Sequence, residues 1–198
     1  LMPEIQDRDS ILVLVLAAAV ARGASERLLP SQSIAPGDTM PPREGSLEAP
    51  TRHPIAWKTP EFYDERIATN LRHMFFAIQA VAPGMIDAGG GSIINLGSDS
   101  WWRAGGGFPV YTTAKAAVHG LTRGMARDLG PHRIRVNTLV PGWTMTERQK
   151  RLWVTPEGLA KQLAAQCLPD PLDPVSVARM ALFLASDDAA MCSANNYM

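Results

Sequence analysis

The sequence of 198 residues predicts an α/β fold that carries the later strands and helices of a doubly wound parallel sheet. Two observations lead to this prediction. From residue 59 onward, short apolar runs alternate with segments of helical periodicity, at lengths that suit crossover connections between parallel strands. Before that point, seven of the sixteen prolines fall between residues 30 and 60, in a region with neither period. We therefore divide the chain into an irregular or divergent N-terminal segment, 1–58, and a regular portion, 59–198.

One apolar run, ILVLVLAAAV at 11–20, interrupts the N-terminal segment. It is too short to span a bilayer. A signal peptide is the alternative, but the preceding residues include Glu4, Asp7 and Asp9 against a single Arg8, whereas a signal needs net positive charge. The composition favours a buried strand, or a strand that continues into a helix.

The first regular element is a helix that begins at Thr59-Pro60, where a capping hydroxyl precedes a proline at the first helical position. We expect it to end at Pro83-Gly84. Its apolar face is predicted from steps of three and four residues: Ile67, Leu71, Phe75, Ile78 and Ala82. The apolar run at 91–96 predicts a short buried strand.

A second long helix is predicted over residues 110–129, followed by a strand over 134–140 that ends at Pro141-Gly142. Two further helices begin at Thr155-Pro156 and Asp173-Pro174, and residues 196–198 resemble the start of another strand. The residues expected to face inward on these helices are Ala114, Ala117, Val118, Leu121, Met125, Leu129, Val177, Met180, Ala181 and Leu184.

The charges balance, with 19 Lys and Arg against 19 Asp and Glu, and no block of like charge is present. Nucleic acid and anionic membrane surfaces are therefore not expected partners. Cys167 and Cys192 show no metal-ligand spacing, and two free thiols in a cytoplasmic protein are the simplest interpretation.

A candidate for proton transfer lies in LGSDSWWRAGGGFPVYTTAK, residues 96–115. Tyr111 and Lys115 are four residues apart, so they share one face of the second long helix, and Ser98 precedes the tyrosine by thirteen residues. A free phenol has a pKa of roughly 10, and a nearby ammonium in a partly desolvated site favours its ionised form. These three side chains are the candidate acid–base set around one substrate oxygen.

The surrounding segments resemble the short-chain dehydrogenase/reductase family. GSIINLGS, YTTAKAAVHGLT and RVNTLVPGWTMT occur in the family's order and spacing, with IATNLRHMFFAIQA upstream and LFLASDDAAMCSANNYM downstream. The resemblance covers about Arg52 to Met198. It implies a Rossmann-like fold, NAD or NADP as cofactor, a small-molecule substrate and a homodimer or homotetramer, in which helices matching 60–82 and 110–129 form subunit contacts.

The resemblance also assigns roles to individual residues. Tyr111 is the general base, Lys115 lowers its pKa and holds the nicotinamide ribose, and Ser98 orients the substrate oxygen. Asn70 supports a water in the proton relay, unless it only kinks its helix and is satisfied by backbone. The residues implied beside the nicotinamide are Pro141, Gly142 and Thr146.

Among members of the family, the chain looks most like the sugar dehydrogenases, which oxidise an aldose to a lactone. Apolar faces for a sugar ring, or else packing surfaces, are offered by Trp101, Trp102, Trp143 and Trp153. Polar groups near the substrate are expected from Asp99, Arg148 and Gln149.

The family's glycine-rich turn, Thr-Gly-x-x-x-Gly-x-Gly, is absent from the sequence, as are its Asn-Asn-Ala-Gly segment and its C-terminal Val-Asp-Gly-Gly. Backbone N–H groups of that turn hold the cofactor pyrophosphate, so weak cofactor binding is expected. Three alternatives stay open: a fragment, a frame-disrupted N-terminus, or a non-catalytic interaction module. Within the family, a ketone or 3-oxoacyl reductase is the alternative to a sugar dehydrogenase.

Overall fold

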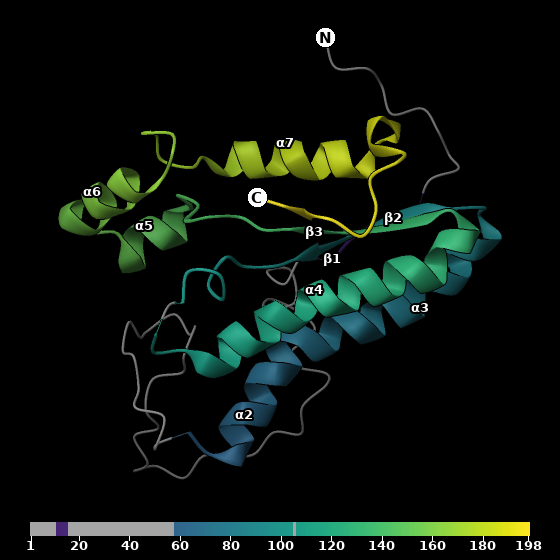
Figure 1. The fold of residues 1–198 in the computed structure, drawn as a ribbon, viewed down its shortest axis with the longest axis horizontal. Coiled ribbons are helices and arrows are strands. Elements are labelled where there is room, and N and C mark those ends of the chain that lie inside the picture. Colours follow the sequence, from purple (N-terminus) through teal and green to yellow (C-terminus); the bar gives the residue numbers. More distant parts are fainter. Residues whose placement is uncertain (1–10, 16–57, 105) are drawn as a thin grey trace.

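The computed structural model describes residues 11–15, 58–104 and 106–198. Most of the predicted N-terminal segment 1–58, including its proline-rich part, lies outside these residues. The described part forms a four-stranded parallel sheet, β1-β2-β3-β4, in chain order (Figure 1). The strands are Ile11–Val15, Gly91–Leu96, Ile134–Leu139 and Asn196–Tyr197. The strands predicted from the sequence are therefore confirmed, and the run at 11–15 is a strand that pairs with β2.

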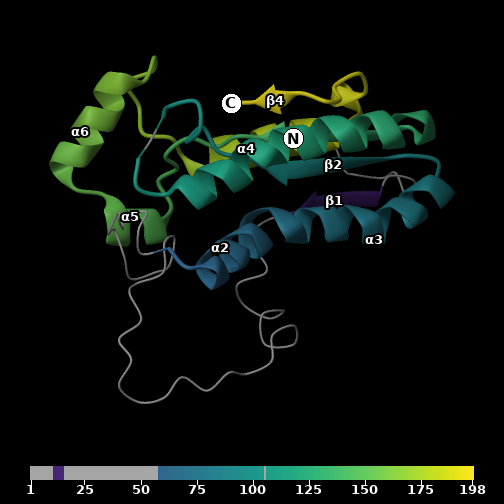
Figure 2. The same cartoon turned by 60° about the horizontal axis from the view of Figure 1, so that its bottom comes forward.

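Helices cover both faces of this sheet, as a doubly wound arrangement requires (Figures 1 and 2). On one face, α3 (His73–Asp87) and α4 (Pro109–Leu129) pack over β2 and β3. On the other face, α7 (Pro174–Ala185) buries Leu184 against Ile94 and Leu139. Because both faces are covered, β2 and β3 are buried along nearly their whole length. The layered α/β fold is confirmed.

The first predicted helix begins where expected but consists of three pieces. They are α2 (Pro60–Ile67), the π-helical segment η3 (Ala68–Arg72) and α3. Thr59 caps α2, its Oγ1 accepting a hydrogen bond from the Phe62 N–H at 3.2 Å. The predicted end at Pro83-Gly84 is wrong, since α3 continues through Pro83 to Asp87. Proline removes the bond to the Gln79 carbonyl, but both residues are exposed, so water can satisfy that oxygen.

The inward face of this helix also differs from the prediction. Phe75 was expected to face the core but is 40% exposed, whereas the adjacent Met74 is fully buried. Ile78 and Ala82, further along the same helix, are buried as predicted, so the difference is confined to the first turn of α3. Met74 and Phe75 both lie three or four residues from Leu71 and Ile78, so spacing alone could not choose between them.

The second long helix, α4, matches its predicted range. Ala117 is exposed, contrary to the prediction, because Ala114, Val118 and Thr122 at steps of four form the buried line. Leu121, Met125 and Leu129 pack against the core as expected. The buried Thr122 hydroxyl connects α4 to two strands. Its Oγ1 accepts hydrogen bonds from Asn95 Nδ2 at 2.9 Å and from Thr138 Oγ1 at 2.8 Å.

The segment after β3 carries a helix that the sequence did not predict, α5 (Glu147–Trp153), and the predicted α6 (Pro156–Ala165). Both lie beyond one end of the sheet (Figure 1). Caps at Thr155 and Asp173 start α6 and α7 as predicted. The remaining short helical turns are η4 (Gly130–His132) and η5 (Asp187–Ala189). Across the described residues, no helix is long and apolar enough to cross a membrane.

Candidate active site

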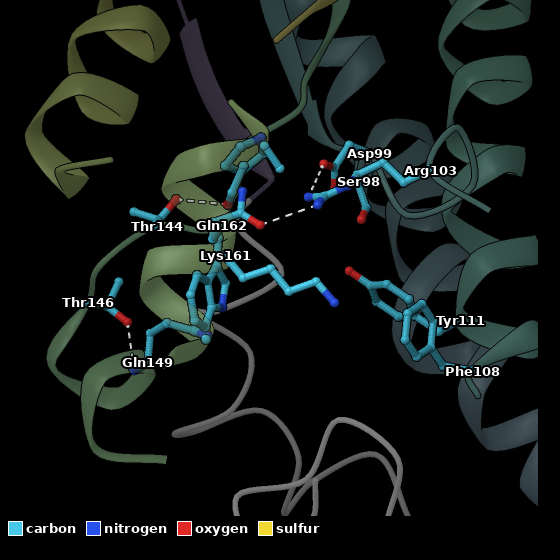
Figure 3. A pocket seen from close by; sticks show the side chains of 16 residues that line it. Ser98, Asp99, Arg103, Phe108, Tyr111, Thr144, Thr146, Gln149, Lys161 and Gln162 are labelled. Atoms are coloured by element: carbon cyan, nitrogen blue, oxygen red, sulfur yellow. Dashed lines mark hydrogen bonds and ion pairs between the residues drawn. The ribbon is translucent and has the colours of Figure 1, made fainter. Parts of the chain in front are cut away.

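A cavity of about 690 Å³ opens at the carboxyl ends of β2 and β3 (Figure 3). Ligands bind at this edge in doubly wound sheets. Its walls come from the loops after β2 and β3, the first turn of α4, and helices α5 and α6. The residues that line the cavity are Gly97, Ser98, Asp99, Arg103, Phe108, Tyr111, Pro141, Gly142, Trp143, Thr144, Thr146, Gln149, Gly158, Lys161, Gln162 and Ala165.

Two predicted hydroxyl groups meet in this cavity. Ser98 lies two residues beyond β2, and Tyr111 is the third residue of α4. Both line the cavity, and the Ser98 hydroxyl interacts with the Tyr111 phenol. The Phe108 ring packs edge-on against the tyrosine ring at 6.0 Å and supports its orientation. The structure therefore brings together the serine and tyrosine on which the proton-transfer prediction depends.

Lys115 lies one turn further along α4, directly behind the tyrosine. It is only 5% exposed, and its Nζ donates a hydrogen bond to the Leu96 carbonyl at 2.9 Å. The ammonium stands 5.8 Å from the centre of the Tyr111 ring. Burial lowers the pKa of Lys115 to about 8. Lys115 therefore holds its proton less tightly than an ordinary exposed lysine does.

The electrostatic balance at Tyr111 differs from the expected lowering by Lys115. Burial of the phenol raises the pKa of Tyr111 and is the largest effect, the Ser98 hydroxyl lowers that pKa, and the Asp99 carboxylate raises it. The phenol is therefore neutral at pH 7 in the chain by itself. Asp99 contributes negative charge to the cavity, but its carboxylate is paired with Arg103 at 3.2 Å.

Asn70 occupies the π-helical segment η3, away from the cavity lining. Its Nδ2 donates to the Arg66 carbonyl of its own helix at 2.9 Å. This contact is the one expected of a residue that kinks a helix and is satisfied by backbone. Its assignment to a proton relay stays a prediction.

The residues predicted to lie beside a nicotinamide form one wall of the cavity. Pro141, Gly142 and Thr146 all line it. Thr146 caps α5, its Oγ1 accepting from the Gln149 N–H at 3.1 Å, so the hydroxyl proton remains available for a carboxamide oxygen. These residues fit the nicotinamide end of a dinucleotide. For the pyrophosphate, the described residues offer no glycine-rich turn of the family's type.

Of the four tryptophans predicted to wall a sugar site, only Trp143 lines the cavity. Trp101 instead donates from Nε1 to His119 Nε2 at 3.1 Å, and Trp102 stacks on it with ring centres 4.2 Å apart. Trp153 and the exposed Arg148 are also outside the lining, whereas Gln149 is part of it. Trp101 and Trp102 both contact the His119 ring edge-on, so they serve as packing surfaces, which was the alternative to a role in sugar binding.

Three polar side chains that the sequence did not single out complete the cavity. Arg103 Nη2 donates to Gln162 Oε1 at 3.2 Å and so joins the loop after β2 to α6. Lys161, beside Gln162, extends its side chain into the cavity toward Tyr111 (Figure 3). Only the position of α6 in the fold reveals Lys161 and Gln162, although the Thr155-Pro156 start signal predicted the helix itself.

Comparison with known proteins adds independent findings. A family model described as enoyl-(acyl carrier protein) reductase matches residues 46–198. D-xylose 1-dehydrogenase of Caulobacter vibrioides is 52% identical over 74% of this chain and 58% of its own length. A probable galactose dehydrogenase of Rhizobium meliloti is 47% identical over 69% of this chain and 53% of its own length. The matched region thus spans little more than half of these curated relatives.

Solved structures agree with this fold. A gluconate 5-dehydrogenase from Burkholderia cenocepacia, in complex with NADP and tartrate, is 28% identical with a TM-score of 0.68, over 74% of this chain and 58% of that one. A 3-oxoacyl-[acyl-carrier protein] reductase from Brucella melitensis is 30% identical with a TM-score of 0.67, over 73% and 53%.

Proposed function

Because the chain belongs to the short-chain dehydrogenase/reductase family, we propose that it transfers a hydride between NAD or NADP and a sugar, oxidising an aldose to its lactone. One observation carries this proposal: Ser98 and Tyr111 face the same cavity, and the Lys115 ammonium is buried directly behind the phenol. A hydroxyl pair with an adjacent cation can hold and deprotonate one alcohol oxygen.

In this mechanism, the anomeric hydroxyl of the aldose lies between Ser98 and Tyr111. Ser98 donates a hydrogen bond to that oxygen, and Tyr111 in its ionised form accepts the proton as the C=O bond forms. Lys115 favours the ionised phenol once substrate excludes water from the cavity. The nicotinamide, when bound, supplies the two-electron acceptor for the hydride that leaves the anomeric carbon. Asn70 is assigned to the solvent end of the relay.

The sugar class is supported by the cavity lining as well as by the relatives. Trp143 offers a flat apolar face, and Gln149, Gln162 and Lys161 offer polar groups around it. A sugar ring presents an apolar face and a rim of hydroxyls, so it matches this mixture. A 3-oxoacyl reductase is the second candidate, supported by the similar Brucella melitensis structure.

The test uses the purified full chain with D-xylose, D-galactose and a 3-oxoacyl thioester, each with both nicotinamide cofactors. Reduction of NAD or NADP by an aldose, followed at 340 nm, is the expected result. NAD(P)H fluorescence measures cofactor binding separately. No binding at millimolar cofactor would overturn the proposal in favour of a non-catalytic module. Turnover of the thioester alone would favour the second candidate.

We also expect the chain to form a homodimer or homotetramer through the helices over residues 60–82 and 110–129, which include α3 and α4. Phe75 and Phe76 on α3 are 40% and 50% exposed, and a Cβ added at Gly120 or Gly124 on α4 would meet no atom within 4 Å. An apolar ridge beside a flat helix face suits a second copy of the same face.

The free thiols fit a cytoplasmic location, which stays a prediction.

A further inference from the structure

One face of α6 forms a wall of the cavity. The residues on this face are Gly158, Lys161, Gln162 and Ala165, which follow each other at helical spacing. Small residues at both ends leave room for a ligand, and two long polar side chains between them reach into the cavity. Lys161 and Gln162 differ in whether their polar groups are available to a substrate.

Gln162 is already engaged. Its Oε1 accepts from Arg103 Nη2 at 3.2 Å, and Arg103 Nη1 is paired with Asp99 Oδ2 at 3.2 Å. The guanidinium and the carboxylate therefore neutralise each other, and Gln162 is held against them. Asp99, Arg103 and Gln162 are therefore bonded to one another and do not form a binding site for an anion.

Lys161 is different. Within the part of the chain that the structure describes, its ammonium has no hydrogen bond or ion pair, and it points across the cavity toward the Tyr111 hydroxyl (Figure 3). The oxygen that Tyr111 and Ser98 would hold is the reacting oxygen. A donor that reaches the same space from the opposite wall meets the next oxygen along the substrate.

We propose that Lys161 is a specificity-determining residue whose ammonium donates a hydrogen bond to the hydroxyl next to the reacting carbon, so that the site selects substrates with vicinal oxygens. This inference rests on the proposed function and deepens it. Lys161 is exposed, so a bound substrate that covers it removes water from the ammonium, and a substrate without that oxygen supplies no acceptor in place of that water. Sites built around such a donor reject the analogue that lacks the acceptor.

The experiment compares D-galactose with 2-deoxy-D-galactose, which lacks only the vicinal hydroxyl. The variants are Lys161→Met, Lys161→Arg and the matched control Lys150→Met, an exposed α5 lysine paired with Glu147 and outside the cavity. Affinity is measured by calorimetry with cofactor present, and kcat/KM is measured in parallel. Thermal melting verifies that each variant is folded.

Lys161→Met should lower affinity and kcat/KM for galactose by about 10- to 100-fold and leave those for the deoxy sugar nearly unchanged. Lys161→Arg should retain part of the preference, and Lys150→Met all of it. Equal losses for both sugars, or no loss for either, would overturn the inference.

The two proposals fail in distinguishable ways. Wild-type chain that binds galactose with this preference but does not oxidise it would refute the proposed hydride transfer and sustain the role of Lys161. Oxidation of galactose with no preference that depends on Lys161 would support the proposed hydride transfer and refute the role of Lys161. Wild-type chain that binds neither sugar would overturn both.

Discussion

The two walls of the cavity are held in place by different forces. The catalytic wall, formed by Gly97, Ser98 and the first turns of α4, stands on the buried core. The recognition wall, formed by α5 and α6, has no fully buried residue in either helix. It is joined to the loop after β2 through the contact of Arg103 with Gln162, and the Met145 N–H, just before α5, donates to the Leu172 carbonyl, just before α7.

This difference separates two requirements on the site. Acid–base chemistry needs fixed distances and a desolvated cation, both of which come from burial in a packed interior. Substrate selection needs side chains that can change without unfolding the protein, and exposed helices with few packing contacts allow this. Substitutions on the recognition wall should therefore change which substrate is used, whereas substitutions on the catalytic wall should change rate or stability.

The largest effect is expected from Tyr111→Phe on the catalytic wall. Loss of the phenolic hydroxyl removes the proton acceptor, so kcat should fall by about 10²- to 10⁴-fold. The ring and its contact with Phe108 remain, so the melting temperature should barely change. Tyr63→Phe, on an exposed α2 position, is the matched control and should keep full activity. A Tyr111 variant with most of its turnover would show that the catalytic wall has been misidentified.

The same two walls explain what the sequence could predict. Ser98, Tyr111 and Lys115 were predictable because one strand end and one helix face fix their relative positions. Phe75 was placed wrongly because Met74 and Phe75 are both apolar and both lie at helical spacing from Leu71 and Ile78. Lys161 and Gln162 were missed because the cavity face of α6 depends on a contact with Arg103, 59 residues away. The helix was predicted to end at Pro83 because proline removes the hydrogen bond to the Gln79 carbonyl. The sequence alone does not show that Gln79 is exposed, so that water can replace this bond.

Lys115→Met is expected to have the second-largest effect, and in opposite directions on activity and stability. Burial lowers the pKa of Lys115 from an ordinary 10.5 to about 8, so the folded chain disfavours the charged lysine. At pH 7 the methionine variant should be more stable by about 1–3 kcal/mol, after allowance for the lost bond to Leu96, and should be nearly inactive.

The pH dependence of this stability gain has a defined sign. Between about pH 8 and 10.5 the unfolded wild-type chain binds more protons at Lys115 than the folded chain, so wild-type stability rises with pH there. The advantage of Lys115→Met should therefore be largest below pH 8 and shrink as pH approaches 10.5. Urea titrations at pH 7 and pH 9.5 measure it, with Lys150→Met as the exposed control. A variant less stable than wild type at pH 7 would contradict the burial argument.

A pair of glycine substitutions compares the packing of the two walls. A Cβ at Gly97 would lie 2.7 Å from Thr138 Cγ2 and 3.0 Å from Val140 Cγ2, both in buried residues. Gly97→Ala should cost about 1–3 kcal/mol and displace the adjacent Ser98. A Cβ at Gly158 on α6 would lie 3.1 Å from Thr155 Oγ1, and the better helix propensity of alanine offsets this contact.

Gly158→Ala should therefore stay within about 1 kcal/mol of wild type. Chemical denaturation of both variants gives the comparison directly. Equal destabilisation would mean that α6 is packed as tightly as the catalytic wall, and the distinction between the walls would have to be abandoned.

The smallest effect is expected from the contact that joins the walls. Gln162→Leu removes this exposed hydrogen bond, and Arg103→Met removes it together with the ion pair to Asp99. A double-mutant cycle isolates the shared bond, whose coupling free energy should be about 0.2–1 kcal/mol. Since the contact positions α6, KM for an aldose should rise a few-fold in either variant while kcat changes little. Steady-state kinetics of the two single variants and the double variant test this. Additive effects would show that Arg103 acts through Asp99 alone, and that α6 is positioned by its connection to α5 rather than by the catalytic wall.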